Sequence, residues 1–163
     1  MVIMRMDHVC ITVPDVDRSI AFYSKALGLK LLRISVLHPN SGTELRNAYM
    51  YSGRFLLELV TADNQAVPKL PPKTWQESLR GSIGFAHLGV RVRNLEAASR
   101  SMEAAGAKRI GESFELRKET TNIAYVNNKV DSRIGYARRP GKKPWRIAVF
   151  SDPDGIVVEL VER

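Results

Sequence analysis

Short segments in which apolar and polar residues alternate are separated by two longer segments with helical spacing of apolar residues. A period of two is typical of β-strands, and apolar residues three and four apart are typical of amphipathic helices. Met6–Val13 fits the strand pattern, which Pro14 ends. Asp15 is a suitable N-cap for a helix that we expect to reach Leu27, and Gly28 is a natural stop. Three strands are then predicted, at Leu29–Leu37, Glu44–Tyr51 and Arg54–Thr61.

The same order of elements returns in the second half of the chain. A strand is predicted at Phe85–Val92, and Asn94 is the expected N-cap of a helix over Leu95–Ala105 that Gly106 ends. Further strands are predicted at Lys108–Arg117, Asn122–Val126, Arg146–Phe150 and Ile156–Val161, the last two joined by the turn DPDG. This internal repeat predicts an α+β fold made of two βαβββ modules in tandem.

The repeat divides the chain into module 1 at 6–61, a proline-containing linker at 62–83 and module 2 at 84–163. The second copy has extra residues at 127–143, a basic segment with Gly and Pro that we expect to be a surface loop. With 163 residues and 44% hydrophobic content, the chain is long enough to form one compact domain over 1–163.

The net charge of +8 allows an acidic partner, but the basic run ARRPGKKPWR contains Gly and Pro and is expected to be a loop. No helix-turn-helix, zinc-finger or RNA-binding motif is present, so nucleic acid is not the expected partner. No apolar run approaches the roughly 20 residues that cross a bilayer. The single cysteine, Cys10, excludes an internal disulfide and fits a cytoplasmic protein.

Four residues stand at equivalent positions of the two copies. His8 and His87 lie in the first strands, and Glu58 and Glu159 lie in the last strands. An ionised carboxylate against an apolar surface is costly unless a cation or good donors meet it. Two imidazoles and two carboxylates suit Zn, Ni, Co, Mn or Fe(II), with positions left for water or substrate. We therefore prefer a metal site to a purely structural role, whereas His38 is expected to be an exposed turn residue.

Strand alternation adds candidates for substrate binding. Cys10 and Thr12 are expected on the face of His8, and Arg91 on the face of His87. Arg91 would either hold a substrate carboxylate or extend into solvent, and the sequence leaves both open. Cys10 is expected to be a small buried residue rather than a nucleophile, because no base partner is evident.

Three segments resemble the vicinal oxygen chelate superfamily, namely DHVCITVPDVDRSIAFYSKALGLKLL, AHLGVRVRNLEAASRSMEAAGAKRI and FSDPDGIVVELVE. The resemblance covers nearly the whole chain except the linker and the basic insertion. It implies that the modules form a curved mixed sheet, the glyoxalase/bleomycin resistance/dioxygenase fold. It also implies that a divalent metal ion is held by His8, Glu58, His87 and Glu159, and that the protein is a homodimer whose sites use one chain or two.

The resemblance also implies a glyoxalase-like lyase or isomerase acting on a small molecule, for which an anionic group is one option. Glu159 or Glu58 would move a proton next to a metal-bound carbonyl, and the sequence does not choose between them. Thr12 and Ala62 stand where glutathione-dependent members carry Arg and Asn. The alternatives are an Fe(II)-dependent extradiol-type dioxygenase, a methylmalonyl-CoA-type epimerase, and a non-catalytic ligand-binding or resistance protein.

Overall fold

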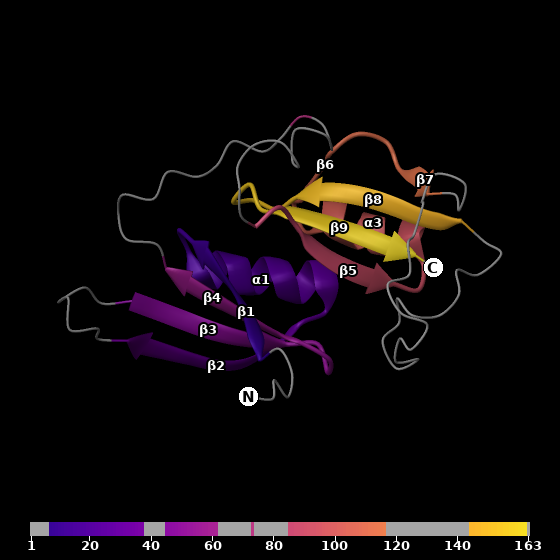
Figure 1. Ribbon diagram of the computed structural model, residues 1–163. Coiled ribbons are helices and arrows are strands. Elements are labelled where there is room, and N and C mark those ends of the chain that lie inside the picture. Colours follow the sequence, from indigo (N-terminus) through magenta and orange to yellow (C-terminus); the bar gives the residue numbers. More distant parts are fainter. Residues whose placement is uncertain (1–6, 38–44, 62–72, 74–84, 117–143, 163) are drawn as a thin grey trace.

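Two modules of similar architecture make up the part of the chain that the computed structural model describes, residues 7–37, 45–61, 73, 85–116 and 144–162. Module 1 consists of β1 (His8–Val13), α1 (Val16–Leu27), β2 (Lys30–Leu37), β3 (Leu45–Tyr51) and β4 (Leu56–Thr61). Module 2 consists of β5 (Leu88–Val92), α3 (Leu95–Ala104), β6 (Lys108–Arg109), β7 (Phe114–Leu116), β8 (Trp145–Ser151) and β9 (Val157–Glu162). The prediction of an α+β fold with tandem modules is confirmed (Figure 1).

The first helix begins and ends where its capping residues predict. The Asp15 side chain accepts a hydrogen bond from the Arg18 backbone N–H at 3.0 Å, which satisfies one of the free donors of the first turn. Gly28 adopts a left-handed conformation with φ of 67°, and its N–H donates to the Ser24 carbonyl. Local sequence therefore determines the length of α1.

In each module the first and last strands are parallel neighbours. The strand orders are β1-β4-β3-β2 and β5-β9-β8-β6, and β7 also pairs with β8. The register places Glu58 beside Cys10 and Glu159 beside Gly89. Each of the two carboxylates thus lies on an inner strand of its sheet. The neighbouring strand begins at His8 in module 1 and just after His87 in module 2.

Two expectations about module 2 need correction. The strand predicted at Lys108–Arg117 is two short strands, because Gly111 between them has φ of 70°, a left-handed conformation that interrupts an extended chain. The strand predicted to begin at Phe85 begins at Leu88, so His87 lies just before β5 and not within the strand. Four features named in the sequence lie outside the described residues: the strand predicted at Asn122–Val126, His38, the basic insertion, and the linker apart from Lys73.

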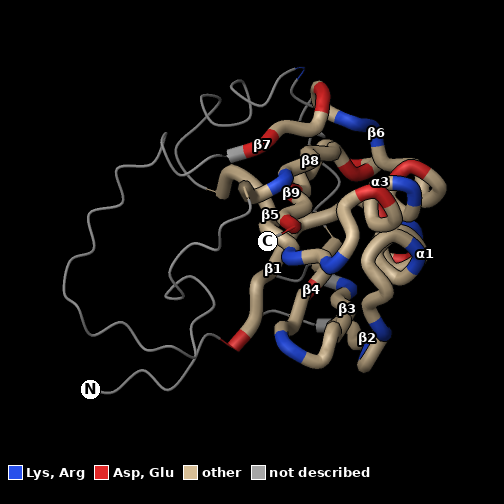
Figure 2. Tube along the Cα trace, turned by 90° about the vertical axis from the view of Figure 1, so that its right-hand side faces the viewer, with Lys and Arg blue, Asp and Glu red and all other residues tan. Residues whose placement is uncertain are grey.

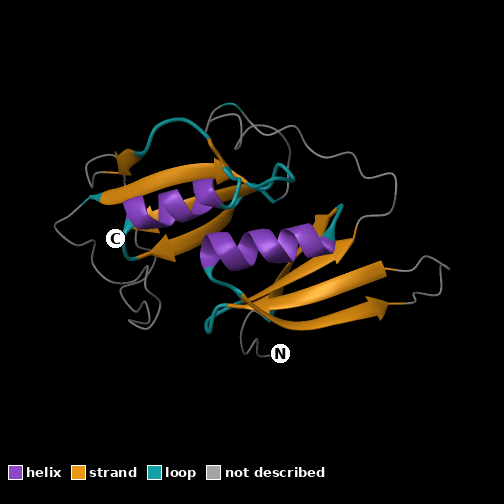
Figure 3. Cartoon of the chain, turned by 180° about the vertical axis from the view of Figure 1, so that it is seen from behind, coloured by secondary structure: helices purple, strands orange, loops and turns teal. Residues whose placement is uncertain are grey.

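The two modules share one hydrophobic core on the helical side. Figure 3 shows α1 and α3 side by side on the same side of the molecule. Tyr23 and Leu57 of module 1 and Leu95 and Phe150 of module 2 are almost fully buried in this core. The other faces of the two sheets point away from the helices. In the described residues, neither helix has the length and hydropathy to cross a bilayer.

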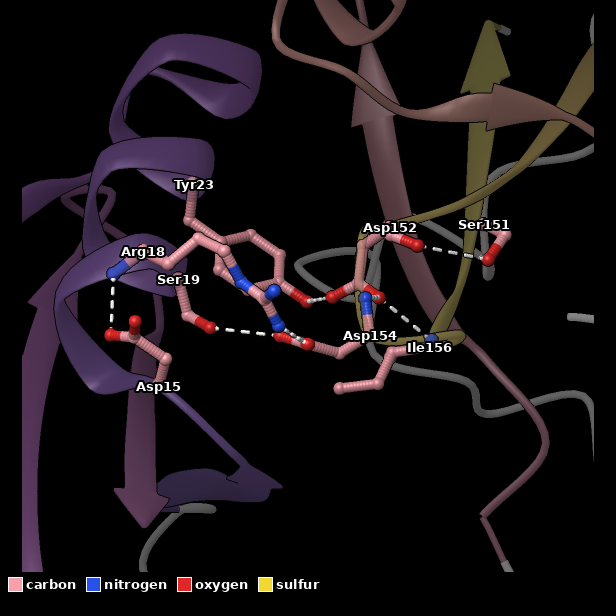
Figure 4. Close-up of polar contacts among 8 residues, drawn as sticks. All are labelled: Asp15, Arg18, Ser19, Tyr23, Ser151, Asp152, Asp154 and Ile156. Atoms are coloured by element: carbon pink, nitrogen blue, oxygen red, sulfur yellow. Dashed lines mark hydrogen bonds and ion pairs between the residues drawn. The ribbon is translucent and has the colours of Figure 1, made fainter. Parts of the chain in front are cut away.

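A cluster of buried polar side chains connects module 2 to module 1 (Figure 4). The Tyr23 hydroxyl on α1 donates to Asp152 Oδ2 at 2.7 Å, and the Ser19 hydroxyl donates to Asp154 Oδ2 at 3.1 Å. Arg18 forms an ion pair with Asp154. The other oxygen of Asp152, Oδ1, accepts the backbone N–H groups of Asp154 and Ile156. The DPDG turn between β8 and β9 is therefore both the end of a hairpin and the attachment point for α1.

Burial also changes the acid–base behaviour of this cluster. It raises the pKa of Tyr23 well above its usual value, and the negative charge of Asp152 adds to the effect. Burial likewise raises the pKa of the Asp152 carboxyl, against the opposing effect of its hydrogen bond from Tyr23. The neutral tyrosine is thus the form that the fold stabilises.

Candidate metal site

The first candidate pair joins the start of β1 to the middle of β4. The Nε2 atom of His8 lies 3.2 Å from Oε2 of Glu58. The other ring nitrogen, Nδ1, lies 3.1 Å from Oδ2 of Asp7. With a proton on Nδ1, where Asp7 can accept it, Nε2 would carry the lone pair that a metal ligand requires.

The second pair has the same arrangement in module 2. The Nε2 atom of His87 lies 3.3 Å from Oε2 of Glu159, at the centre of β9. Gly89 is the neighbour of Glu159 on β5, and a Cβ atom there would lie 3.7 Å from Oε2. A side chain larger than a methyl group at this position would compete for the space beside the carboxylate.

The two carboxylates differ in their surroundings. Glu58 is only 8% exposed, and its Oε1 atom accepts a hydrogen bond from Asn47 Nδ2 at 2.7 Å. Burial raises the Glu58 pKa, but hydrogen bonds from Asn47, Tyr49 and Cys10 outweigh it, so the pKa is below its usual value. Burial raises the pKa of Glu159, and the charge of His87 opposes this only in part. Glu58 is therefore held as an anion, while Glu159 binds a proton more readily.

Cys10 corrects one expectation. The residue is exposed rather than buried, because β1 is the edge strand of its sheet and this face is not the one that α1 covers. Partial desolvation, together with the charge of Glu58 and a hydrogen bond to it, raises the Cys10 pKa to about 11. A thiol with this pKa is almost entirely protonated at neutral pH, which argues against a nucleophilic role.

The remaining predicted substrate-binding residues lie on the expected faces. Thr12 neighbours Val60 on β4, two residues beyond Glu58, and Arg91 neighbours Val161 on β9, two residues beyond Glu159. Both Thr12 and Arg91 are exposed. Their roles in substrate binding stay predictions.

Sequence reasoning missed the residues that surround Glu58 from the neighbouring strand. Asn47 and Tyr49 lie two apart on β3, and the register puts Tyr49 directly beside Glu58. The Tyr49 ring also meets the His8 ring edge-on, with centroids 5.9 Å apart. Alternation within the predicted strand 44–51 could have placed both on one face, but only the register between strands shows that this face is the one that carries Glu58.

The four candidate ligands are brought together as two pairs and not as one cluster. Among the residues that the structure describes, no three His, Cys, Asp or Glu side chains form a group that could hold a metal ion. Each pair offers one imidazole nitrogen and one carboxylate oxygen, a donor set that suits a divalent metal but leaves its coordination incomplete. Each module thus contains one histidine–glutamate pair.

Known proteins with similar sequences carry the name lactoylglutathione lyase. The chain is 28% identical over 159 residues to the lactoylglutathione lyase of Salmonella typhimurium, and the match covers 98% of this chain and 93% of that protein. It is 29% identical over 163 residues to the probable chloroplastic lactoylglutathione lyase of Arabidopsis thaliana. That match covers 98% of this chain, which spans 36% of the plant protein's length.

A solved structure shows the same fold. A glyoxalase family protein from Bacillus cereus superposes with a TM-score of 0.67 at 17% identity, over 99% of this chain and 95% of that one. The family model described as the Glyoxalase/Bleomycin resistance protein/Dioxygenase superfamily matches residues 5–160. The chain therefore belongs to the glyoxalase/bleomycin resistance protein/dioxygenase superfamily.

Proposed function

We propose that this protein is a metal-dependent lyase or isomerase of the glyoxalase type that works as a homodimer. In each site a divalent metal ion would be bound by His8 and Glu58 of one chain and by His87 and Glu159 of the partner subunit. The observation that carries the proposal is the matched pair of contacts, 3.2 Å and 3.3 Å between imidazole Nε2 and carboxylate Oε2, at equivalent places of the two modules.

Two-fold symmetry would bring the histidine–glutamate pair of module 1 in one chain together with the pair of module 2 in the other chain. Both pairs lie on sheet faces that point away from α1 and α3, whereas the modules contact each other through those helices. A second copy related by a two-fold axis can place its module 2 opposite module 1 of the first chain, and the reverse. The dimer would then contain two equivalent sites, each with two imidazoles and two carboxylates.

We assign different roles to the two carboxylates. When bound, the metal ion polarises a substrate carbonyl oxygen and so acidifies the neighbouring C–H group. Asn47 occupies Oε1 of Glu58, so we assign Glu58 as a fixed ligand. Among the described residues, only the His87 ring is within bonding distance of Glu159. Glu159 would take the proton from the carbon next to the carbonyl and return it to that carbon. Where that carbon carries a hydroxyl, Glu159 would instead return the proton to the carbonyl carbon while the hydroxyl proton passes to the carbonyl oxygen.

The relatives named lactoylglutathione lyase support this class of reaction. Thr12, however, offers a hydroxyl where we would expect a cationic anchor for a glutathione carboxylate. We therefore expect a small carbonyl substrate whose anionic group, if it has one, is held by another residue.

Complementation between two inactive variants tests the shared site. One variant carries His8→Ala with Glu58→Ala, and the other carries His87→Ala with Glu159→Ala. Each homodimer should lose bound metal, because every site would lack two ligands. After the two are unfolded together and refolded, random pairing gives about half heterodimers, each with one intact site. We expect about one quarter of the wild-type metal content by elemental analysis.

The control is Glu103→Ala on the exposed surface of α3, which should keep the full metal content. If the mixture binds no metal, the sites do not span two chains. If the wild-type protein itself binds none after dialysis against Zn, Ni, Co, Mn and Fe(II), the metal-dependent function is wrong. Oxygen consumption with a catechol and tolerance of Glu58→Ala would instead indicate a dioxygenase.

A further inference from the structure

Arg33 is an exposed cation on the same sheet face as Glu58. The register pairs Arg33 on β2 with Tyr49 on β3, and Tyr49 with Glu58 on β4. Side chains directly opposite in a sheet share a face, so these three point to the side that carries the His8–Glu58 pair. Arg33 thus stands two strands from the candidate metal ligand.

The Tyr49 ring connects Arg33 to the metal pair. The Arg33 guanidinium carbon lies 4.9 Å from the centroid of this ring, while the His8 ring meets the same ring edge-on. Stacking over an aromatic face fixes the plane of a guanidinium and leaves its N–H edges available. The contact therefore orients the cation without using its hydrogen-bond donors.

No described carboxylate neutralises Arg33. By contrast, Arg46 is paired with Asp17, and Arg146 is paired with Glu96 and Glu162. Figure 2 shows that both modules carry basic as well as acidic positions along the chain. The ring contact of Arg33 is its one recorded interaction among the residues that the structure describes. A planar donor group held in this way beside a site is suited to bind a carboxylate with two hydrogen bonds.

A buried acceptor on the same face points independently to a ligand. Asn47 is 2% exposed and neighbours Ser35 of β2. Its Nδ2 atom donates to Glu58, but its Oδ1 atom has no hydrogen-bond partner. A buried polar atom without a partner is costly, and a ligand hydroxyl or an ordered water molecule would satisfy it. The sheet face between Glu58 and Arg33 therefore carries a buried oxygen atom that a donor group of a ligand would satisfy.

We propose that Arg33 binds a carboxylate at the far end of the substrate, so that the substrate class is a short 2-oxo compound with a second, terminal carboxylate. This inference rests on the proposed function, which places the reacting carbonyl beside Glu58. Two strand spacings separate the backbones of Glu58 and Arg33 by about 10 Å, and the two side chains shorten the gap that a ligand must bridge. A five-carbon 2-oxo acid has a suitable length.

The test compares two probes that differ in the terminal carboxylate, 2-oxoglutarate and 2-oxopentanoate. Their dissociation constants would be measured by titration calorimetry with the dimer loaded with Ni²⁺. We expect 2-oxoglutarate to bind about tenfold more tightly to the wild-type protein, as one charge-assisted bidentate contact predicts. Arg33→Met should remove this preference and leave the affinity for 2-oxopentanoate unchanged. Arg33→Lys should keep part of it.

The matched control is Arg100→Met on α3, an exposed arginine on the helical side that should leave both affinities as in the wild type. Circular dichroism would verify that each variant is folded. Equal affinities for the two probes, an equal loss of both in Arg33→Met, or no binding of either would overturn the assignment. Metal content measured on the same samples separates the two proposals: metal without a probe preference refutes only the role of Arg33. An Arg33-dependent preference without metal refutes only the metal-dependent function.

Discussion

At the scale of single residues, Glu58 and Glu159 differ in the groups that oppose the effect of burial on their pKa values. Both carboxylates lie in mid-strand among apolar neighbours. Asn47, Tyr49 and Cys10 lower the pKa of Glu58, whereas the pKa of Glu159 has only His87 acting against desolvation. Equivalent positions of a repeat have thus acquired unequal chemistry through their neighbours on adjacent strands.

The reactivity of the Cys10 thiol in metal-free protein depends on the charge of Glu58. Glu58→Gln removes the negative charge that contributes to the raised pKa of Cys10, so the pKa should fall from about 11 toward its usual value. Desolvation, the larger cause of the raised Cys10 pKa, is not removed by this substitution. In metal-free protein at pH 9, we expect iodoacetamide to alkylate Cys10 about threefold faster or more in the variant. Glu103→Gln is the control, and an unchanged rate in Glu58→Gln would show that the two groups do not interact.

Tyr23 makes stability depend on alkaline pH. Its folded-state pKa is raised, so it stabilises the fold fully below the unfolded-state value of about 10, and this stabilisation is lost as the pH rises above that value toward the folded-state pKa. Tyr23→Phe should be less stable by about 1–3 kcal/mol at pH 8, because Asp152 loses its buried donor. The difference in the free energy of unfolding between the wild type and Tyr23→Phe should become smaller above pH 10.

Urea unfolding of both proteins at pH 8 and pH 10.5 measures this effect. Tyr51→Phe, at an exposed position, should show a constant difference from the wild type across the same range. If the difference in the free energy of unfolding between the wild type and Tyr23→Phe does not change with pH, the Tyr23 phenol ionises as readily in the folded protein as in the unfolded one.

At the scale of elements, capping residues determine where helices end and glycines determine where strands break. Asn94 caps α3 through its side chain, which accepts the Ala97 backbone N–H at 2.8 Å, as Asp15 does for α1. Gly111 divides the strand that alternation alone predicts as continuous. These are local effects, which explains why most element boundaries can be predicted to within two residues.

Gly28 allows a clean test of a helix end. A Cβ atom there would meet nothing within 4 Å, so the cost of Gly28→Ala is the left-handed backbone conformation alone. We expect a loss of about 1 kcal/mol in the free energy of unfolding, measured with urea. Gly28→Asn should cost less, since asparagine tolerates this conformation better. Equal losses for the two substitutions would point to a cause other than backbone strain.

At the scale of the whole molecule, the sequence predicts the two modules and places one candidate histidine and one candidate glutamate in each, but it does not predict how the modules are joined. The repeat placed His8 and Glu58 in strands that prove to be parallel neighbours. Tyr23 and Asp152 form the attachment between modules across 129 positions of sequence, and no local pattern connects them. The same limit applies to Arg33, whose relation to Glu58 depends on the register of three strands. Contacts set by packing between distant segments are therefore the part that sequence reasoning lacks.

The attachment of the DPDG turn to α1 has a consequence for synthesis of the protein on the ribosome. All the strands of module 1 have been made once residue 61 has been added, yet Tyr23 and Ser19 find their acceptors only on Asp152 and Asp154. Until that turn emerges, the α1 surface that will contact module 2 stays open to water or to chaperones. The nascent chain must therefore keep its first module soluble until residues 152–154 have been made and can pair with α1.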